Sequence, residues 1–379
     1  MTTWILSCSG CGHQEPQDAG VGVCARCGQP FLVRFTSTPP SRDRILTRWD
    51  LWRYAAALPI GDDEPPVSLG EGLTPLLESP QLARHAGVRR LWVKDEGVNP
   101  TASFKARGLA AAVTRARARG VPGLVVPTAG NAGAALAAYG AAAGIPVRVY
   151  APATTPRPIL DTIRAMGVEL KTVDGHIGDA GKLSVEFAKE SGYFNVATLR
   201  EPYRVEGNKT LALELAEQLD WRLPDVVVYP TGGGEGVIGM WKAFGEMRDW
   251  TWTNAPIPRI VVAQAEGCAP IVRALNEGAD RATAWENPTT HAAGLRVPSP
   301  LGDRLVLRAI RETRGDAAAA SEDSIREATR TIASTTGIDA APEGGCGLAV
   351  LTDLVRQGRV DPASQVVLYN TGSGASYRS

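Results

Sequence analysis

The chain has 379 residues, of which 44 % are hydrophobic and 21 % charged, a composition typical of a globular protein with two or three domains. Its 40 Lys and Arg residues balance 40 Asp and Glu residues, so no basic excess attracts nucleic acid or an acidic membrane surface. No run approaches the ~20 apolar residues of a membrane helix, and residues 1–8 lack the basic and apolar parts of a secretory signal. We expect a cytoplasmic protein that binds neither nucleic acid nor membrane.

Two Cys-x-x-Cys pairs stand near the N-terminus, with twelve residues between them: Cys8 and Cys11, then Cys24 and Cys27. Four thiolates at this spacing suit tetrahedral zinc, and a closed shell of four cysteines leaves no open position for catalysis. A ribbon that binds nucleic acid or a partner is the alternative, and the neutral charge of the chain disfavours it. The sequence therefore predicts a structural zinc ribbon over residues 1–37.

From about residue 39, short apolar runs alternate with helical patterns, which indicates parallel βαβ organisation. The predicted strands are residues 91–93, 123–126, 147–150, 169–173, 226–229, 260–264 and 366–369. Predicted helices between them include residues 106–120, 132–143, 158–166, 207–219 and 236–247. In doubly wound α/β folds ligands bind where strands end, so the turns from strand to helix are the places to search for chemistry.

The first such turn leads through Asn99-Pro-Thr-Ala-Ser-Phe to Lys105. These polar, turn-forming residues place Lys105 at or near the N-terminus of a helix, where the helix dipole disfavours its charge. A lowered amine pKa is what an imine-forming lysine needs. An ordinary solvated lysine is the alternative.

The second turn is Pro127-Thr-Ala-Gly-Asn131-Ala-Gly133, which precedes an alanine-rich helix. Small residues at a helix N-terminus let backbone N–H groups approach an anion such as an α-carboxylate. The same residues could instead serve tight packing between helix and sheet.

The third turn, Pro230-Thr-Gly232-Gly-Gly-Glu-Gly236, offers a backbone nest for a phosphate. It also contains a formal G-x-G-x-x-G from Gly234 to Gly239, with Glu266 beyond the next strand. An NAD-dependent oxidoreductase is therefore the rival interpretation. Against it, the spacing to Glu266 exceeds the usual ~20 residues, and it leaves Lys105 without a role.

The fourth turn holds Thr371 among glycines near the C-terminus, where a neutral hydroxyl could meet the nitrogen of a heterocycle. Taken alone, it is equally compatible with an ordinary terminal turn. Together, however, the four turns supply an imine-forming lysine, an anion-binding loop, a phosphate nest and a hydroxyl. These are the groups that bind pyridoxal phosphate (PLP).

With these motifs the chain resembles the threonine synthases, within the tryptophan synthase β-like (fold type II) group of PLP enzymes. The matching segments are Gly70-Glu-Gly-Leu-Thr-Pro75, Lys94-Asp-Glu-Gly97, Ser103-Phe-Lys105, Ala129-Gly-Asn131-Ala-Gly133, Glu206-Gly-Asn-Lys-Thr210, Pro230-Thr-Gly-Gly-Gly234, Ala341-Pro-Glu-Gly344 and Thr371-Gly-Ser-Gly374. The resemblance implies an α/β fold of two doubly wound parallel-sheet domains after the zinc ribbon. Residues 38–89 and 205–379 would form the larger, phosphate-binding domain, and residues 90–204 the smaller domain with Lys105. It also implies a homodimer.

The resemblance assigns a role to each site residue. Lys105 would be the Schiff-base lysine, Asn131 would bind the phenolic oxygen of the cofactor, and Thr371 would face its pyridine nitrogen. The cofactor's phosphate would lie on Gly232, Gly233, Gly234 and Gly236. The amino-acid substrate would contact Ser103, Thr128, Ala129 and Gly130, with Arg204 and Lys209 near the substrate's own phosphate.

The implied reaction turns O-phospho-L-homoserine and water into L-threonine and phosphate. The chain departs from the family pattern at Thr198-Leu199, where some relatives have an Asn-Ser pair that contacts the substrate phosphate. A sister reaction therefore remains open: β-elimination or β-replacement of the cysteate synthase, threonine or serine dehydratase, or diaminopropionate ammonia-lyase kind.

Overall fold

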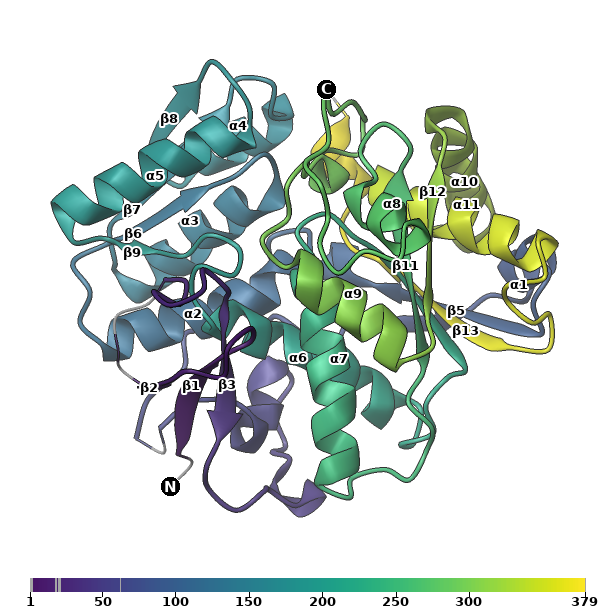
Figure 1. Cartoon of the computed structure of the whole chain (residues 1–379), viewed down its shortest axis with the longest axis horizontal. Coiled ribbons are helices and arrows are strands. Elements are labelled where there is room, and N and C mark those ends of the chain that lie inside the picture. Colours follow the sequence, from purple (N-terminus) through teal and green to yellow (C-terminus); the bar gives the residue numbers. More distant parts are fainter. Residues whose placement is uncertain (1–2, 18, 20–21, 62, 379) are drawn as a thin grey trace.

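Three β-sheets organise the part of the chain that the structure describes (Figure 1). The computed structural model describes residues 3–17, 19, 22–61 and 63–378. Within these residues, no helix is both long and apolar enough to cross a membrane. The architecture confirms the predicted α/β class with parallel sheets and a small separate body at the N-terminus.

The N-terminal sheet is antiparallel, in the order β2-β1-β3. It comprises β1 (Trp4–Cys8), β2 (Gln14–Pro16) and β3 (Phe31–Phe35). Alternate residues of β1 are buried, and they join a core cluster with helix α2 (Lys105–Ala118). The ribbon is therefore packed onto the rest of the protein. Two 3-10 segments follow it, η1 (Arg42–Arg44) and η2 (Leu51–Ala57).

A four-stranded parallel sheet has the order β8-β7-β6-β9 and lies at the upper left of Figure 1. Its strands are β6 (Leu124–Pro127), β7 (Val147–Pro152), β8 (Glu169–Val173) and β9 (Phe194–Asn195). One face packs against α2, α3 and α4, and the other against α5. These helices span α3 (Asn131–Ala143), α4 (Arg157–Ala165) and α5 (Ile177–Ser191).

The largest sheet has six strands in the order β12-β11-β10-β13-β5-β4, and only the edge strand β4 runs antiparallel to its neighbour. The strands are β4 (Leu76–Glu78), β5 (Arg90–Asp95), β10 (Val226–Pro230), β11 (Arg259–Ala265), β12 (Asp316–Ala320) and β13 (Gln365–Asn370). The central strands are buried on both faces, as parallel strands between helix layers are.

Alternate residues of these strands face different helices. One face packs against α1 (Pro80–Ala86), α10 (Glu322–Thr336) and α11 (Pro342–Arg356). The other packs against α6 (Tyr203–Gln218), α7 (Glu235–Asp249), α8 (Pro270–Asn276) and α9 (Asp303–Glu312). Three short 3-10 turns, η3 (Glu96–Val98), η4 (Ala293–Leu295) and η5 (Gly374–Tyr377), lie between these elements.

All seven strands and five helices predicted from the sequence are present, with ends shifted by a few residues. One predicted strand lies in a different sheet from the one expected, because β5 pairs with β13 in the six-stranded sheet. Residues 90–95 were expected in the smaller domain and instead belong to the larger sheet. We propose that the smaller domain begins after β5, and that the other expected boundaries hold.

Helices α2 and α6 cross at two facing glycines, Gly108 and Gly207. A side chain at Gly207 would press into the carbonyl of Arg107 closer than real Cβ atoms approach backbone. At this crossing Arg107 is fully buried and pairs with Glu96 (2.7 Å) and Glu214 (2.8 Å). The close crossing brings the first residues of both helices together.

Candidate active site

Two adjoining cavities lie between the two larger sheets, and they share Lys105, Asn131, Gly233 and Gly294 as lining residues. The smaller cavity has about 60 Å³ and is lined by the glycine-rich turn before α7. The larger has about 570 Å³ and is lined by the turn before α3 and by α5. All seven residues predicted to bind the cofactor line the smaller cavity.

Lys105 is the first residue of α2, as the sequence predicted, and its side chain faces both cavities. Its Nζ lies 3.7 Å from Oε2 of Glu235 and 4.2 Å from the centre of the Phe104 ring. Burial lowers the pKa of Lys105 to about 8, while the carboxylate of Glu235 opposes the shift and the guanidinium of Arg204 adds to it. About a tenth of the amine is therefore neutral and nucleophilic at pH 7, far more than for an exposed lysine.

The glycine turn between β10 and α7 forms a cradle of backbone. Gly234 caps α7 with a φ of +86°, a conformation that suits glycine. A Cβ on Gly232 would collide with the carbonyl oxygen of Gly294, and one on Gly236 with the hydroxyl of Tyr229. The first N–H groups of a helix have no intrahelical acceptor and favour an anion. This turn therefore fits the phosphate of PLP.

The opposite wall of the smaller cavity comes from the C-terminal turn. Thr371 follows β13, and its carbonyl accepts a hydrogen bond from the N–H of Phe104 (3.1 Å), which ties this turn to the start of α2. Glu343 accepts hydrogen bonds from the N–H of Gly294 and from the hydroxyl of Tyr377, both at 2.7 Å. Burial raises the pKa of Glu343.

The turn before α3 forms part of the larger cavity. The Thr128 hydroxyl donates to the carbonyl of Gly130 (2.7 Å) and accepts from its N–H (3.1 Å), so this side chain shapes the loop. Ala129, Gly130 and Asn131 line the cavity beside it. Ser103 lies behind the wall: it is fully buried, bridges to Gly372, and its hydroxyl has no partner among the described residues.

The structure does not place the two predicted substrate cations in either cavity. Arg204 is buried, and its guanidinium donates to Glu235 (2.6 Å) and to the carbonyl of Val196 (2.7 Å). Lys209 is fully buried between α6 and α7, where Glu206 and Glu246 neutralise its ammonium. The charge of Lys209 is therefore satisfied by carboxylates of the protein and not by a ligand.

Five further residues line the site, and none of them was predicted as a site residue. Glu235, Gly294 and Tyr377 line the smaller cavity, while Arg200 and Arg296 line the larger one. Glu235 stands inside the glycine motif, so its position was visible in the sequence, although its partners were not. Gly294 and Arg296 come from the loop around η4, far from any signal in the sequence.

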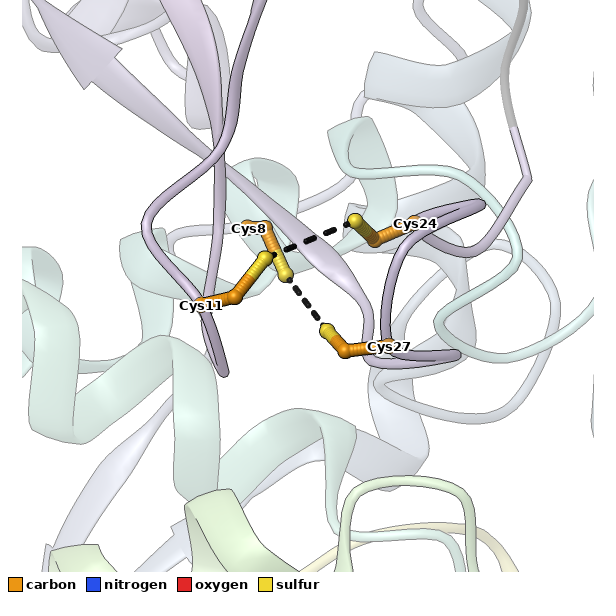
Figure 2. Close-up of side chains that lie close together, drawn as sticks. All are labelled: Cys8, Cys11, Cys24 and Cys27. Carbon is orange, nitrogen blue, oxygen red and sulfur yellow. Dashed lines mark hydrogen bonds between the residues drawn. The ribbon is translucent and has the colours of Figure 1, made fainter.

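The four N-terminal cysteines come together as predicted (Figure 2). Their sulfur atoms all lie within 4.8 Å of one another, with Cys8 Sγ 3.3 Å from Cys27 Sγ and Cys11 Sγ 3.7 Å from Cys24 Sγ. Tetrahedral zinc with bonds of about 2.3 Å needs sulfur atoms roughly 3.8 Å apart. The donor set and its spacing fit one structural zinc ion.

Comparisons with known proteins agree with this geometry. A family model described as pyridoxal-phosphate dependent enzyme matches residues 67–372. A threonine synthase of Methanosarcina acetivorans is 34 % identical over 372 residues, covering 97 % of this chain and 91 % of the relative. A threonine synthase of Methanocaldococcus jannaschii is 35 % identical over 376 residues, covering 98 % and 92 %.

Solved structures show the same fold. A serine racemase from maize is similar with a TM-score of 0.69 and 22 % identity, covering 79 % of this chain and 88 % of that one. A threonine deaminase from Solanum lycopersicum has a TM-score of 0.67 and 20 % identity, covering 79 % of each chain. The family match replaces the dinucleotide-binding interpretation of Gly234 to Gly239, and Gly239 instead packs against Asn208 of α6.

Proposed function

We propose that this chain, which belongs to the family of pyridoxal-phosphate-dependent enzymes, is a threonine synthase that converts O-phospho-L-homoserine and water to L-threonine and phosphate. The observation that carries the proposal is identity of 34–35 % with threonine synthases over 97–98 % of the chain. The shared position of Lys105 and Asn131 between a phosphate-sized cradle and a larger cavity supports it.

In this proposal the smaller cavity holds the phosphate of the cofactor, and its ring lies where the two cavities meet at Lys105 and Asn131. The backbone of Gly232, Gly233, Gly234 and Gly236 binds its phosphate, Asn131 its phenolic oxygen, and Thr371 its ring nitrogen, while Lys105 holds its aldehyde carbon. Bound PLP supplies an electron sink for the negative charge that develops when an amino acid loses its Cα proton. Thr371 is a neutral partner and cannot stabilise a protonated ring nitrogen as a carboxylate would.

The residues of the chain supply the proton transfers and the orientation. The neutral Nζ of Lys105 takes the proton from Cα and then moves one from Cβ, and phosphate leaves from Cγ with the electron pair of its C–O bond. Backbone N–H groups of the Thr128–Asn131 turn hold the substrate carboxylate at the N-terminus of α3. A proton returned to Cγ forms the methyl group. Water then adds its hydroxyl at Cβ, a proton is returned to Cα, and the remaining proton of water leaves with phosphate.

We also propose which cations meet the phosphate of the substrate. Arg204 and Lys209 already have carboxylate partners. Arg200 and Arg296 line the larger cavity, and neither has an acidic partner among the residues that the structure describes. A dianionic phosphate group gains most from arginines whose charge is not already compensated.

Further parts of the proposal concern the whole protein. We propose a cytoplasmic homodimer, as the family resemblance implies, in which zinc held by Cys8, Cys11, Cys24 and Cys27 has a structural role. Reduced thiols are required for that site, which is consistent with a reducing compartment. Analytical ultracentrifugation and zinc analysis of the purified protein test the dimer and the metal.

The test of the proposed activity is the product formed from O-phospho-L-homoserine. Purified holoenzyme should release phosphate and threonine in equal amounts, and Lys105→Ala should do neither. A PLP-loaded protein that releases no phosphate would contradict the proposal.

One observation favours a second candidate. Glu235 compensates Arg204, and Thr198-Leu199 offers fewer phosphate contacts than the family pattern, so the cavity could take an unphosphorylated amino acid. The candidate is β-elimination or β-replacement on serine, threonine or phosphoserine. Formation of a keto acid or a β-substituted product from one of these, without threonine from O-phospho-L-homoserine, would establish it.

A further inference from the structure

Glu235 is a buried carboxylate in an unusual place, directly after the glycine cradle and beside the reactive amine. It is the first residue of α7, lines the smaller cavity and is 2 % exposed. Its Oε2 lies 2.6 Å from the guanidinium of Arg204 and 3.7 Å from Nζ of Lys105, while its buried Oε1 has no hydrogen-bond partner among the described residues. A carboxylate here repels the phosphate that the cradle fits, and this cost points to a compensating role.

The charges around Lys105 come from three helices. Arg204 lies at the start of α6, Glu235 at the start of α7 and Glu343 in the first turn of α11. A fourth group, Glu201, is buried just before α6 and hydrogen-bonds to the N–H of Arg204, and burial raises its pKa to about 8. Glu201 is therefore largely uncharged at neutral pH, and it offers Arg204 and Lys105 little negative charge.

The role of Lys105 demands two protonation states in one place. As a base its amine must be neutral, and after it takes the Cα proton it is an ammonium in a desolvated site beside the cation Arg204. Without a nearby anion, that ammonium would be strongly disfavoured and the proton transfer would be uphill. Among the residues that the structure describes, Glu235 is the carboxylate within ion-pairing distance of both cations.

We propose that Glu235 is a positioning residue that stabilises the protonated form of Lys105, because its Oε2 both compensates Arg204 and faces the ammonium. The proposal rests on the proposed function in one respect, because it takes Lys105 as the base. No covalent bond is made to Glu235: the proton passes from substrate Cα to Nζ, and Glu235 balances the charge that appears there. The neutral pair of Arg204 and Glu235 also leaves Arg204 without net attraction for a substrate anion.

The test measures the protonation of Lys105 without cofactor or substrate. Apoprotein is labelled with a trace of acetic anhydride between pH 6 and 10, and acetylation of the peptide carrying Lys105 is quantified by mass spectrometry. The wild-type midpoint should lie near pH 8. In Glu235→Gln the midpoint should fall by about one pH unit, a tenfold change in the neutral fraction of the amine. Glu235→Asp keeps the charge and should lie close to wild type.

Two further variants make the result specific. Glu246→Gln removes a buried, ion-paired carboxylate from the same helix, outside both cavities, and should lower stability without moving the midpoint. Arg204→Gln removes the neighbouring cation and should move the midpoint upward. An unchanged or raised midpoint in Glu235→Gln, or an equal shift in Glu246→Gln, would overturn the proposal.

A kinetic measurement then links the charge to the reaction. In the holoenzyme Lys105 is a free amine only after substrate has bound, so the acidic limb of kcat for Glu235→Gln should shift to lower pH in parallel with the labelling midpoint, and kcat should fall more than KM changes. If the labelling midpoint shifts while the protein has no threonine synthase activity, the proposed reaction fails and the electrostatic role of Glu235 stands. If the enzyme is active and the midpoint does not shift, only the role of Glu235 fails.

Discussion

Burial changes the pKa of the Lys105 side chain. Its pKa is lowered to about 8 from the 10.5 of an exposed lysine, chiefly because desolvation penalises the ammonium. Below pH 8 the neutral fraction falls roughly tenfold per pH unit. We therefore predict that the rate of PLP uptake by apoprotein rises steeply up to about pH 8 and levels off above it. Stopped-flow absorbance measures this rate. A rate that keeps rising to pH 10 would show that burial does not lower the pKa.

Within the glycine cradle, the two neighbouring glycines Gly232 and Gly233 should differ in tolerance. A methyl group at Gly232 meets the fixed carbonyl of Gly294, whereas one at Gly233 meets Thr198 Cγ2 at 3.1 Å, a side chain that can move. We predict that Gly232→Ala weakens PLP affinity by about 5- to 150-fold, since a clash of this kind costs typically 1–3 kcal/mol. Gly233→Ala should weaken it less. Equal affinities, measured by equilibrium dialysis, would place the phosphate elsewhere.

The uncompensated arginines of the larger cavity lead to a prediction about specificity. Replacing Arg296 or Arg200 with Ala should raise KM for O-phospho-L-homoserine by about tenfold or more, because a charged hydrogen bond is lost. Lys182, 77 % exposed and paired with Asp179 at the rim of the same cavity, is the matched control, and its replacement by Ala should have little effect. Unchanged KM values in both arginine variants would move the substrate phosphate away from them.

At the scale of elements, the crossing of α2 and α6 holds the site together. Gly207→Ala should destabilise the protein by about 1–3 kcal/mol, because the methyl group forces α6 away from the carbonyl of Arg107. Gly245→Ala on α7 has open space around it and should instead stabilise slightly, by up to about 1 kcal/mol. Urea unfolding of the two variants measures the contrast. A Gly207→Ala protein as stable as wild type would show that the helices need no such contact.

The conformation of strand β12 does not follow from its local sequence. Its sequence Asp-Ala-Ala-Ala-Ala favours a helix by intrinsic propensity. The segment is nevertheless a strand, because it pairs with β11 at the edge of the six-stranded sheet and its small side chains fit beneath α8 and α9. Neither the alternation nor the β-branched residues that mark β10 and β13 are present. Tertiary pairing overrides propensity there.

In the whole molecule, the N-terminal ribbon packs against α2 and α6. Trp4 stacks on the guanidinium of Arg115, Phe35 lies 4.7 Å from the ammonium of Lys209, and the Tyr203 hydroxyl donates to the carbonyl of Gln17 (2.6 Å). The ribbon therefore contributes to a core that it shares with the rest of the chain.

This shared core gives a prediction for zinc removal. Chelation should lower the melting temperature of the whole protein and raise hydrogen exchange in residues 3–35 and along the facing sides of α2 and α6. PLP should stay bound, because no ribbon residue lines either cavity among the described residues. Differential scanning fluorimetry, with zinc restored as the control, measures the change. An unchanged melting temperature, or loss of PLP with the zinc, would contradict this prediction.

Local sequence is enough to predict the features that depend on backbone conformation within a few residues. The glycines of the cradle, the start of α2 at Lys105 and the four-cysteine spacing each encode a conformation within a few residues, and all three are where the sequence predicted them. The central strands β10 and β13 were visible as well, since a strand buried on both faces requires a continuous apolar run.

Which charged side chains pair with one another depends instead on how the helices pack in space. Arg204 and Glu235 are 31 positions apart in sequence, and their pairing exists because α6 and α7 start at the same wall of the site. The same packing surrounds Lys209 with carboxylates and brings Gly294 from the η4 loop to the cradle. Ion pairing in a desolvated interior depends on distance in space, which no local pattern specifies. That is why the sequence predicted the cofactor site and not the cations that remain available to a substrate.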